Sequence, residues 1–331
     1  MHYRNLGASN LQVSTLCLGT MMFGDPTPKE EAAAMVADAR SHGVNYIDTA
    51  DVYSRGVAES MLGEVLKGQR HDWVLATKLG NKMSDKVNES KFSRTWMLRE
   101  IDACLLRLQT DYVDIMYMHL DINGMNLEEP LRAMNAMLQA GKIRYWGVSN
   151  FRGWRIAEAV HLARQMNMPA PVVCQPYYNL LNRMPEVEVL PACAFYGLGV
   201  TPYSPVARGV LTGKYMPGQA PAADSRAGRG NKRLSETEFR EESFLIAQKL
   251  QAYVANKGVS LAQFATAWVL ANPRVSSVIA GPRTLQQWQD YLPALDYTVT
   301  AEDEAMVDSL VRPGHPSTPG YTDPAYPLNG R

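Results

Sequence analysis

The sequence holds few cysteines and histidines, and neither residue type is spaced like a disulfide or metal site. The four cysteines lie far apart among apolar neighbours and form no CxxC pair, so we expect buried, reduced thiols rather than a disulfide framework. The six histidines include no closely spaced pair like those of common zinc motifs. The sequence therefore predicts no metal site.

Net charge and long apolar runs are also missing. Because 33 basic residues balance 33 acidic residues, no overall field favours nucleic acid or an anionic membrane, and we expect a small or neutral partner. No uninterrupted apolar run is long enough to span a bilayer, and the first residues, MHYRNLGASN, lack the basic region and apolar core of a signal peptide. We expect a soluble cytoplasmic protein; the sequence does not distinguish a monomer from a homo-oligomer.

The chain alternates short apolar runs with longer stretches of helical periodicity, as in repeated βα units. In three places a glycine separates the helical stretch from the next apolar run, namely Gly43, Gly141 and Gly197, which is typical of a helix C-terminus before a strand. Eight strands are expected, at Thr15–Leu18, Val44–Ile47, Trp73–Thr77, Val113–Met118, Ile143–Val148, Val172–Cys174, Val200–Pro202 and Val275–Ala280.

Eight such units predict an α/β fold closed into a (β/α)8 TIM barrel, with the active site at the C-terminal ends of the strands. The alternative is a doubly wound nucleotide-binding sheet, which needs a glycine fingerprint after its first strand. CLGTMMFGDP carries only Gly19 and Gly24 there, which matches neither GxGxxG nor a P-loop. We expect one barrel domain over residues 1–331, with a long loop at 206–239 and an irregular, proline-rich tail at 312–331.

Six consecutive strands, the second to the seventh, end in hydrogen-bonding side chains. Taken singly, each has a structural interpretation: Asp48 as a helix cap, Lys78 as a solvated strand end, His119 as a buried structural histidine. Because all barrel strands end at one mouth, six such endings together favour a functional site. The side chains are Asp48, Lys78, His119, Ser149 with Asn150, Gln175, and Tyr203 with Ser204.

An acid, a lysine, a tyrosine and a histidine at one mouth suit proton donation to a carbonyl oxygen. A phenol has a reference pKa near ~10 and is a reluctant proton donor at neutral pH. Lys78 beside Tyr53 is expected to lower that pKa, and Asp48 to keep the lysine ammonium charged and oriented. His119 would bind the carbonyl oxygen and orient the substrate.

Because no side chain can deliver a hydride, such a reaction needs a cofactor that carries one. Asn150 and Gln175 offer amides that suit a nicotinamide carboxamide, and Tyr203 offers a flat face for its ring. The segments RGVLTGKY and IAGPRT place Lys214 and Arg283 next to glycines, which suits a diphosphate and an adenosine 2′-phosphate respectively. Either cation could equally be a solvated surface charge.

Seven stretches together make the chain similar to the aldo-keto reductase superfamily over almost its full length, from Tyr3 to about Leu292. Within the superfamily, the sequence resembles bacterial oxidoreductases that are themselves similar to the beta subunits of voltage-gated potassium channels. The matching stretches are IDTADVYS, ATKLG, DYVDIMYMH, AGKIRYWGVSNF, CQPYYNLLNR, PYSPVARGVLTGKY and IAGPRT.

The resemblance implies a catalytic tetrad of Asp48, Tyr53, Lys78 and His119. It implies carbonyl reduction, because the steroid double-bond reductases of the family carry glutamate in place of the histidine. It also implies NADPH (NADP+) rather than NADH, because Arg283 matches the family's 2′-phosphate contact. The implied cofactor contacts are Ser149, Asn150, Gln175 and Tyr203 at the nicotinamide, with Thr20 and Met21 nearby, Leu211, Gly213 and Lys214 at the diphosphate, Arg283 at the 2′-phosphate, Gln287 close to the adenosine, and in addition Ser204 and Gly281.

The sequence departs from the family pattern near the cofactor. Asp290 and Tyr291 stand where related sequences often carry Glu-Asn, so the usual asparagine contact to adenine is absent. Pro282, Val206 and Arg208 replace smaller residues common in relatives. We expect these changes to affect cofactor affinity rather than the chemistry.

The leading interpretation is reversible, NADPH-dependent reduction of a small aldehyde or ketone, with the hydride from the nicotinamide and the proton from Tyr53. The resemblance to channel subunits implies an alternative, a regulatory subunit that binds NADP as a redox sensor and has little turnover. A third alternative is a barrel isomerase or aldolase that uses Lys78 as a Schiff base. The sequence does not identify the carbonyl substrate.

Overall fold

The computed structural model describes residues 1–223 and 225–327, and the chain forms two compact units. Unit 1 comprises Met1–Pro176, Glu188–Thr201 and Arg274–Trp288, and unit 2 comprises Tyr177–Val187, Pro202–Pro273 and Gln289–Arg331. The expected loop at 206–239 and tail at 312–331 both fall in unit 2, where residues 224 and 328–331 lie outside the described residues. The expectation of a single domain over the whole chain stays a prediction.

Unit 1 contains eight parallel strands that form a barrel, which confirms the predicted fold. The strands are β3 (Leu16–Gly19), β4 (Tyr46–Asp48), β5 (Val74–Leu79), β6 (Val113–Met118), β7 (Ile143–Ser149), β8 (Val173–Gln175), β9 (Gly199–Val200) and β10 (Val278–Ala280). They are paired in sequence order, with β10 next to β3. The ring closes because Val200 forms a parallel bridge with Val275, and the amide of Ser276 donates to the carbonyl of Val200 at 2.8 Å.

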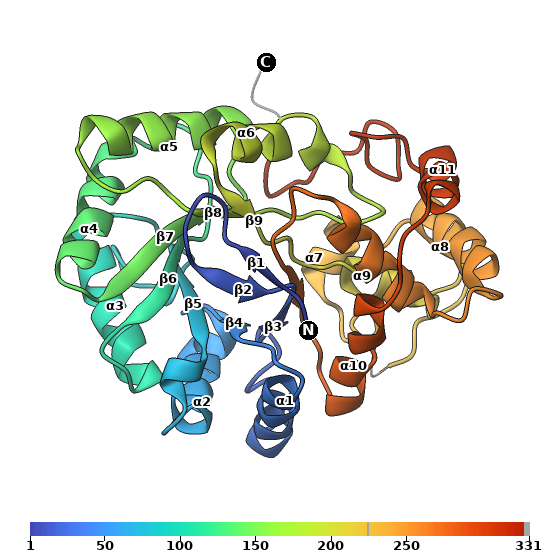
Figure 1. Ribbon diagram of the computed structural model, residues 1–331, viewed down its shortest axis with the longest axis horizontal. Coiled ribbons are helices and arrows are strands. Elements are labelled where there is room, and N and C mark those ends of the chain that lie inside the picture. Colours follow the sequence, from blue (N-terminus) through green and yellow to red (C-terminus); the bar gives the residue numbers. More distant parts are fainter. Residues whose placement is uncertain (224, 328–331) are drawn as a thin grey trace. The chain divides into compact units, whose positions relative to one another are not determined.

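Helices connect the strands of unit 1, as the periodicity predicts, and Figure 1 shows α1 to α5 on the outside of the strands. Gly43, Gly141 and Gly197 have φ of 78°, 69° and 78°, the left-handed conformation that ends a helix, so these three predictions are confirmed. The elements are α1 (Lys29–Ser41), η1 (Tyr53–Gly56), α2 (Val57–Val65), η2 (Arg70–Asp72), α3 (Arg94–Leu108), α4 (Glu128–Gln139), α5 (Gly153–Gln165), α6 (Val189–Tyr196) and α10 (Leu285–Gln289).

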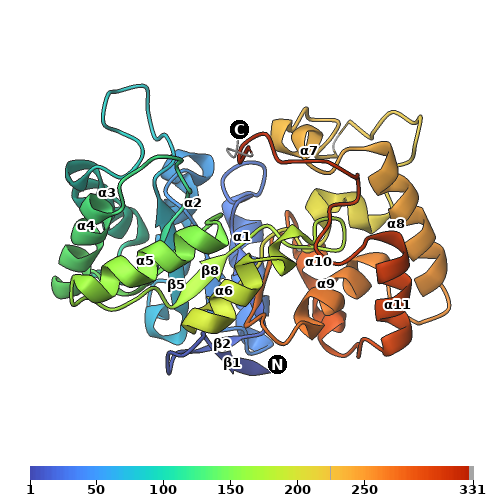
Figure 2. The same cartoon turned by 90° about the horizontal axis from the view of Figure 1, so that it is seen from above.

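An antiparallel hairpin that the sequence pattern did not predict precedes the barrel. Strands β1 (Tyr3–Asn5) and β2 (Gln12–Ser14) lie together at one end of the barrel (Figure 2). The turn of the hairpin carries Leu6, which is fully buried, and Gly7, where an added Cβ would lie 2.3 Å from the backbone nitrogen of Gly199. The hairpin therefore closes the N-terminal end of the strands and leaves their C-terminal ends for the site.

Unit 2 is mainly helical, and α8, α9 and α11 lie side by side in Figures 1 and 2. Two of its helices begin with a capping box, Ser260 with Gln263 in α9 and Thr300 with Asp303 in α11, which satisfies free amides at the helix start. None of the described helices of either unit is long and apolar enough to cross a membrane. The elements of unit 2 are η3 (Met184–Glu186), η4 (Ala207–Thr212), α7 (Lys232–Glu236), α8 (Glu241–Val254), α9 (Leu261–Ala271), η5 (Leu292–Leu295) and α11 (Ala301–Leu310).

Candidate active site

The four residues of the expected tetrad all lie in unit 1, at the C-terminal ends of three neighbouring strands. Asp48 is the last residue of β4, Lys78 lies near the end of β5, His119 follows β6 directly, and Tyr53 begins η1 after β4. Asp48 and Lys78 are buried, whereas Tyr53 and His119 are half-buried. The sheet order therefore brings the buried charges of Asp48 and Lys78 together, next to the partly exposed side chains of Tyr53 and His119.

The ammonium group of Lys78 has all three of its N–H donors occupied. It donates to Oδ1 of Asp48, to the backbone oxygen of Thr49 at 2.8 Å and to the hydroxyl oxygen of Tyr53 at 3.1 Å. An ammonium has three donors and no acceptor, so the phenol oxygen of Tyr53 is the acceptor in the last of these bonds. The proton of the phenol consequently remains available for a different acceptor.

Asp48 holds Lys78 in place and is itself held by Thr20, which follows the neighbouring strand β3, and by Gln175 of β8. Its Oδ2 accepts a hydrogen bond from Nε2 of Gln175 at 2.8 Å, and its backbone oxygen accepts from the amide and the hydroxyl of Thr20 at 3.0 and 3.1 Å. Burial by itself would lower the pKa of Lys78, but Asp48 and Tyr53 outweigh this effect and raise that pKa. Lys78 is therefore an oriented cation at neutral pH.

The pKa of Tyr53 departs from the prediction. Burial raises the pKa of Tyr53, and the lowering effect of Lys78 offsets this only in part, while Asp48 raises the pKa further. The predicted net decrease in the pKa of Tyr53 is therefore wrong. Removing the phenolate from water costs more free energy than its attraction to the ammonium of Lys78 gives back. Tyr53 is a protonated phenol at neutral pH.

His119 is held uncharged beside Tyr53. Burial, and then the charge of Lys78, lowers the pKa of His119 well below its usual value. The rings of His119 and Tyr53 are 6.1 Å apart in an edge-to-face arrangement, and Nδ1 of His119 is buried without a hydrogen-bond partner among the described residues. A neutral imidazole and a protonated phenol thus lie next to each other, and both can donate a hydrogen bond.

Five of the expected nicotinamide contacts also belong to unit 1. Ser149 ends β7 and donates its hydroxyl to the backbone oxygen of Gln175, in β8, at 3.0 Å. Asn150 has φ of +62° and donates from Nδ2 to the backbone oxygen of His119 at 3.1 Å. Thr20 is buried and Met21 is 42% exposed. The two carboxamides and the hydroxyl thus lie at the C-terminal ends of β7 and β8, the two strands that follow β6 around the barrel.

The expected adenosine-phosphate segment follows β10 in unit 1 and is fixed through its backbone. The backbone oxygen of Arg283 accepts a hydrogen bond from the hydroxyl of Thr27 at 2.7 Å, and its amide donates to Oε1 of Gln287 at 2.9 Å. Gly281 is exposed, with no atom within 4 Å of a Cβ added there. Gln287 thus orders the backbone that carries the guanidinium of Arg283.

The remaining expected contacts lie in unit 2. Tyr203 is half-buried, with its ring 5.6 Å from that of Tyr177, and burial raises its pKa to about 12. Ser204 has φ of +59°, and its backbone oxygen accepts from Nδ2 of Asn179 at 3.0 Å. The backbone of Tyr203 is held by a parallel bridge with Tyr177, and that of Ser204 by Asn179, both residues of the same unit.

The expected diphosphate contacts lie near the end of η4 in unit 2 and at the two residues that follow it. Leu211 is buried, Gly213 ends the turn with φ of +75°, and Lys214 is exposed. An added Cβ at Gly213 would lie 2.4 Å from Oε1 of Gln251, so no other residue fits this turn without displacing that side chain. Tyr291, at the expected adenine end, is buried.

Comparison with known proteins identifies the family of this chain. The sequence profile of the aldo/keto reductase family matches residues 15–312. The chain belongs to this family. The match spans all eight barrel strands, from β3 to β10, and it confirms the predicted superfamily.

Three curated relatives resemble this aldo/keto reductase over nearly their whole lengths. Two are named probable voltage-gated potassium channel subunit beta: one from Oryza sativa subsp. japonica is 37% identical over 97% of this chain and 100% of its own. The other, from Arabidopsis thaliana, is 38% identical over 89% of this chain and 92% of its own. The third, the uncharacterized oxidoreductase YrpG of Bacillus subtilis strain 168, is 34% identical over 98% of this chain and 99% of its own.

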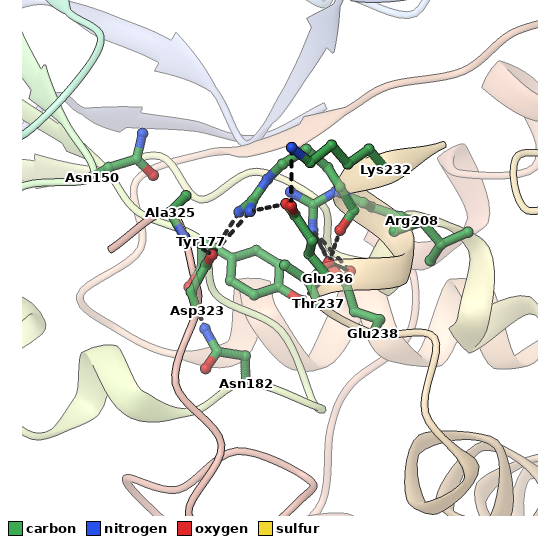
Figure 3. Close-up of polar contacts among 12 residues, drawn as sticks. Asn150, Tyr177, Asn182, Arg208, Lys232, Glu236, Thr237, Glu238, Asp323 and Ala325 are labelled. Atoms are coloured by element: carbon green, nitrogen blue, oxygen red, sulfur yellow. Dashed lines mark hydrogen bonds and ion pairs between the residues drawn. The ribbon is translucent and has the colours of Figure 1, made fainter. Parts of the chain in front are cut away.

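One departure from the family pattern, Arg208, is explained by unit 2 of this aldo/keto reductase. Its guanidinium donates from Nη1 to Oε1 of Glu238 at 2.7 Å and to the hydroxyl of Thr237 at 3.0 Å, and it lies 5.0 Å from the ring centroid of Tyr177 (Figure 3). The hydroxyl of Tyr177 donates to the same carboxylate. Arg208 therefore neutralises a buried glutamate and joins the two ends of the loop at 206–239.

A second buried charged cluster of this aldo/keto reductase carried no sequence signal. Glu59 in α2 binds both Thr77 and Arg107, and Arg107 also binds Glu100 in α3. Glu59 and Thr77 are fully buried. A single glutamate in an amphipathic helix is usually solvated, so the pattern around Glu59 did not distinguish it from a surface residue.

Proposed function

We propose that this aldo/keto reductase is a cytoplasmic oxidoreductase that reduces a small aldehyde or ketone to the alcohol with NADPH, reversibly. One observation carries the proposal: the ammonium of Lys78 donates to both Asp48 and the hydroxyl oxygen of Tyr53, with an uncharged His119 beside the phenol. This set can hold a carbonyl oxygen and deliver a proton to it. The oxidoreductase name of the relative from B. subtilis supports the same class of reaction.

Each residue of the tetrad has a separate role in the proposed reaction. Tyr53 gives its proton to the carbonyl oxygen, and the adjacent ammonium of Lys78 stabilises the phenolate that remains. Asp48 keeps that ammonium charged and fixes its direction. His119, as a neutral donor, orients the carbonyl oxygen toward the phenol.

The residues around the tetrad fit a nicotinamide cofactor. The carboxamides of Asn150 and Gln175 and the hydroxyl of Ser149 are a donor and acceptor set that suits the cofactor's own carboxamide. NADPH supplies the hydride when it is bound, since the protein has no source of one. Arg283, half-buried on an anchored backbone, supports preference for a 2′-phosphate and so for NADPH over NADH.

The cofactor contacts expected in unit 2 remain part of the proposal. Tyr203 provides an aromatic face, and Ser204 lies next to it in the chain. Leu211, Gly213 and Lys214 form a tight turn with an exposed ammonium, which suits a diphosphate. The adenine contact is not assigned, because Asp290 and Tyr291 occupy the place of the usual asparagine.

The proposal is tested by steady-state oxidation of NADPH against a panel of aromatic, aliphatic and sugar-derived aldehydes, repeated with NADH. We expect turnover on at least one class, with a lower KM for NADPH than for NADH. Arg283→Leu should reduce the difference between the two cofactors, whereas Arg229→Leu, on an exposed arginine, should not. Absence of turnover on every carbonyl would contradict the proposal.

A second candidate is a regulatory subunit that binds NADP and turns over slowly. The names of the rice and Arabidopsis relatives, at 37% and 38% identity, favour it. It predicts a protein that purifies with stoichiometric, slowly exchanging nicotinamide and a membrane partner, and that shows little or no turnover with any carbonyl of the panel. Because the same panel gives opposite results for the two candidates, it distinguishes them.

A further inference from the structure

The carboxylate of Glu59 joins three elements of unit 1 from a fully buried position. Its Oε1 accepts a hydrogen bond from the hydroxyl of Thr77 in β5 at 2.5 Å, and its Oε2 accepts from Nε of Arg107 in α3 at 2.7 Å. The side chain of Glu59, in α2, is 0% exposed. Burying a carboxylate is costly unless it is paired and hydrogen-bonded, and here both oxygens are satisfied.

The first of these bonds acts on the strand that carries Lys78. Thr77 directly precedes Lys78 in β5, and successive side chains of a strand point to opposite faces of the sheet. Lys78 therefore reaches toward Asp48 and Tyr53 on the inner face, while Thr77 reaches toward Glu59 on the outer face. The hydrogen bond to Glu59 fixes, from outside, the backbone from which Lys78 extends.

The second bond acts on the turn that carries Tyr53. The residues after Tyr53, namely Ser54, Arg55 and Gly56, have φ of 48°, 53° and 90°, a conformation that is unfavourable for the first two and persists only where the surroundings hold it. Arg107 lies against this turn, because a Cβ added at Gly56 would be 2.7 Å from its Cδ. The guanidinium that packs on the turn is therefore the one that Glu59 binds.

We infer that Glu59 is a positioning residue that sets the distance between Nζ of Lys78 and the hydroxyl of Tyr53. Glu59 touches neither group. It holds β5, the strand that carries Lys78, through Thr77, and it holds the turn that carries Tyr53 through Arg107. The inference rests on the proposed function, because the distance matters for proton delivery by Tyr53. Glu100 serves as a comparison, because its carboxylate binds the same guanidinium at 2.5 Å but lies on α3, the helix that also carries Arg107.

The test compares Thr77→Val, Thr77→Ser and a matched Thr201→Val. Thr201 is also a buried threonine of the barrel, and its hydroxyl lies 3.1 Å from that of Tyr117. Thr77→Val should lower kcat for carbonyl reduction about tenfold, because a small misplacement of a proton donor is costly. KM and the Kd for NADPH should stay within about twofold of wild type. Thr77→Ser keeps the hydroxyl and should restore kcat, and Thr201→Val should leave kcat unchanged.

A second readout does not depend on turnover. The ring carbon that bears the hydroxyl of Tyr53, observed by NMR in protein with 13C-labelled tyrosine and assigned with Tyr53→Phe, reports the hydrogen bond from Lys78. Its resonance should move in Thr77→Val and stay in place in Thr201→Val. If wild type reduced no carbonyl, the proposed function would fail, while this resonance would still decide whether Glu59 positions Tyr53.

The result that overturns the inference is wild-type kcat and an unmoved Tyr53 resonance in Thr77→Val, or an equal loss of kcat in Thr201→Val. If Thr77→Val does not fold, Glu59→Gln and Glu100→Gln replace it, since each removes the negative charge of one carboxylate that binds Arg107. Loss of kcat and a moved Tyr53 resonance only in Glu59→Gln support the inference. Equal effects of the two substitutions contradict it.

Discussion

Nζ of Lys78 lies 3.1 Å from the hydroxyl oxygen of Tyr53, with the lysine as the donor. The two other donors of the ammonium are taken by Asp48 and by the backbone oxygen of Thr49. Because of this geometry, the phenol receives a hydrogen bond from a cation and retains its own proton for a substrate. The same ammonium then stabilises the phenolate after the proton has left.

The pH dependence of kcat for reduction should be flat from about pH 7 to about pH 9. The pKa values of Tyr53 and Lys78 are raised above their ordinary values, and that of His119 lies well below its own, so none of the three titrates in this range. Because the protonated phenol is the active form, a raised pKa extends activity to higher pH, and loss is expected only above about pH 10. A fall in kcat centred near neutral pH, measured in a buffer series of constant ionic strength, would refute this prediction.

Asp48→Asn should lower both stability and turnover. It leaves the buried ammonium of Lys78 without its counter-charge, and breaking a buried pair costs about 3 kcal/mol or more. Chemical denaturation and kcat measure the two effects. The matched control is Asp85→Asn, which breaks the exposed pair with Lys82 and should change neither. Equal unfolding midpoints for all three proteins would show that the pair with Asp48 is not the anchor described above.

Asp51→Asn should stabilise the protein at pH 8 and have little effect at pH 4. Burial, and then Glu59 and Glu100, raises the pKa of Asp51 well above its usual value, and its Oδ2 is buried without a partner among the described residues. A carboxyl group whose pKa is higher in the folded than in the unfolded state makes the protein less stable as pH rises above the unfolded pKa. The amide does not titrate, and it keeps the oxygen that accepts from the amide of Val52 at 2.6 Å.

Thermal unfolding at the two pH values checks the prediction for Asp51. The Tm of Asp51→Asn should exceed that of wild type by about 2 °C or more at pH 8 and match it at pH 4. The same difference in Tm at both pH values would mean that the carboxyl group of Asp51 does not titrate differently in the folded chain.

Gly56→Ala should destabilise the fold more than Gly68→Ala. Both glycines have positive φ, 90° and 79°, but an added Cβ meets Cδ of Arg107 at 2.7 Å in the first and has no atom within 4 Å in the second. Gly68→Ala therefore measures the conformational cost alone, about 1 kcal/mol. The additional loss in Gly56→Ala, measured by denaturant titration, is the contact with Arg107. Equal losses of stability in the two variants would show that the contact with Arg107 does not add to the cost of Gly56→Ala.

The barrel could be predicted because its signals are local. A glycine ends each of α1, α4 and α6, and each apolar run that follows is one strand. Only the ends differ: the apolar run predicts a strand throughout Val275–Ala280, whereas β10 begins at Val278. The hairpin of β1 and β2 was missed because three-residue strands are too short to show alternation, although GASN between them is typical of a turn.

The details of the site depend on burial and on contacts between distant residues, which the sequence does not display. The strand ends predicted that Asp48, Lys78 and His119 meet, since parallel strands finish at one mouth. The net pKa shift of Tyr53 could not be predicted, because it depends on how much water the fold removes from the phenol. The pairing of Glu59 with Arg107 spans 48 positions, and no periodicity links them.

The most direct test of the central claim is turnover of Tyr53→Phe with NADPH and 4-nitrobenzaldehyde, measured beside NADPH binding by fluorescence. If the phenol of Tyr53 delivers the proton, kcat falls at least about a hundredfold, while the Kd for NADPH stays within about twofold of wild type. Turnover of Tyr53→Phe at the wild-type rate, with unchanged NADPH binding, would contradict the account.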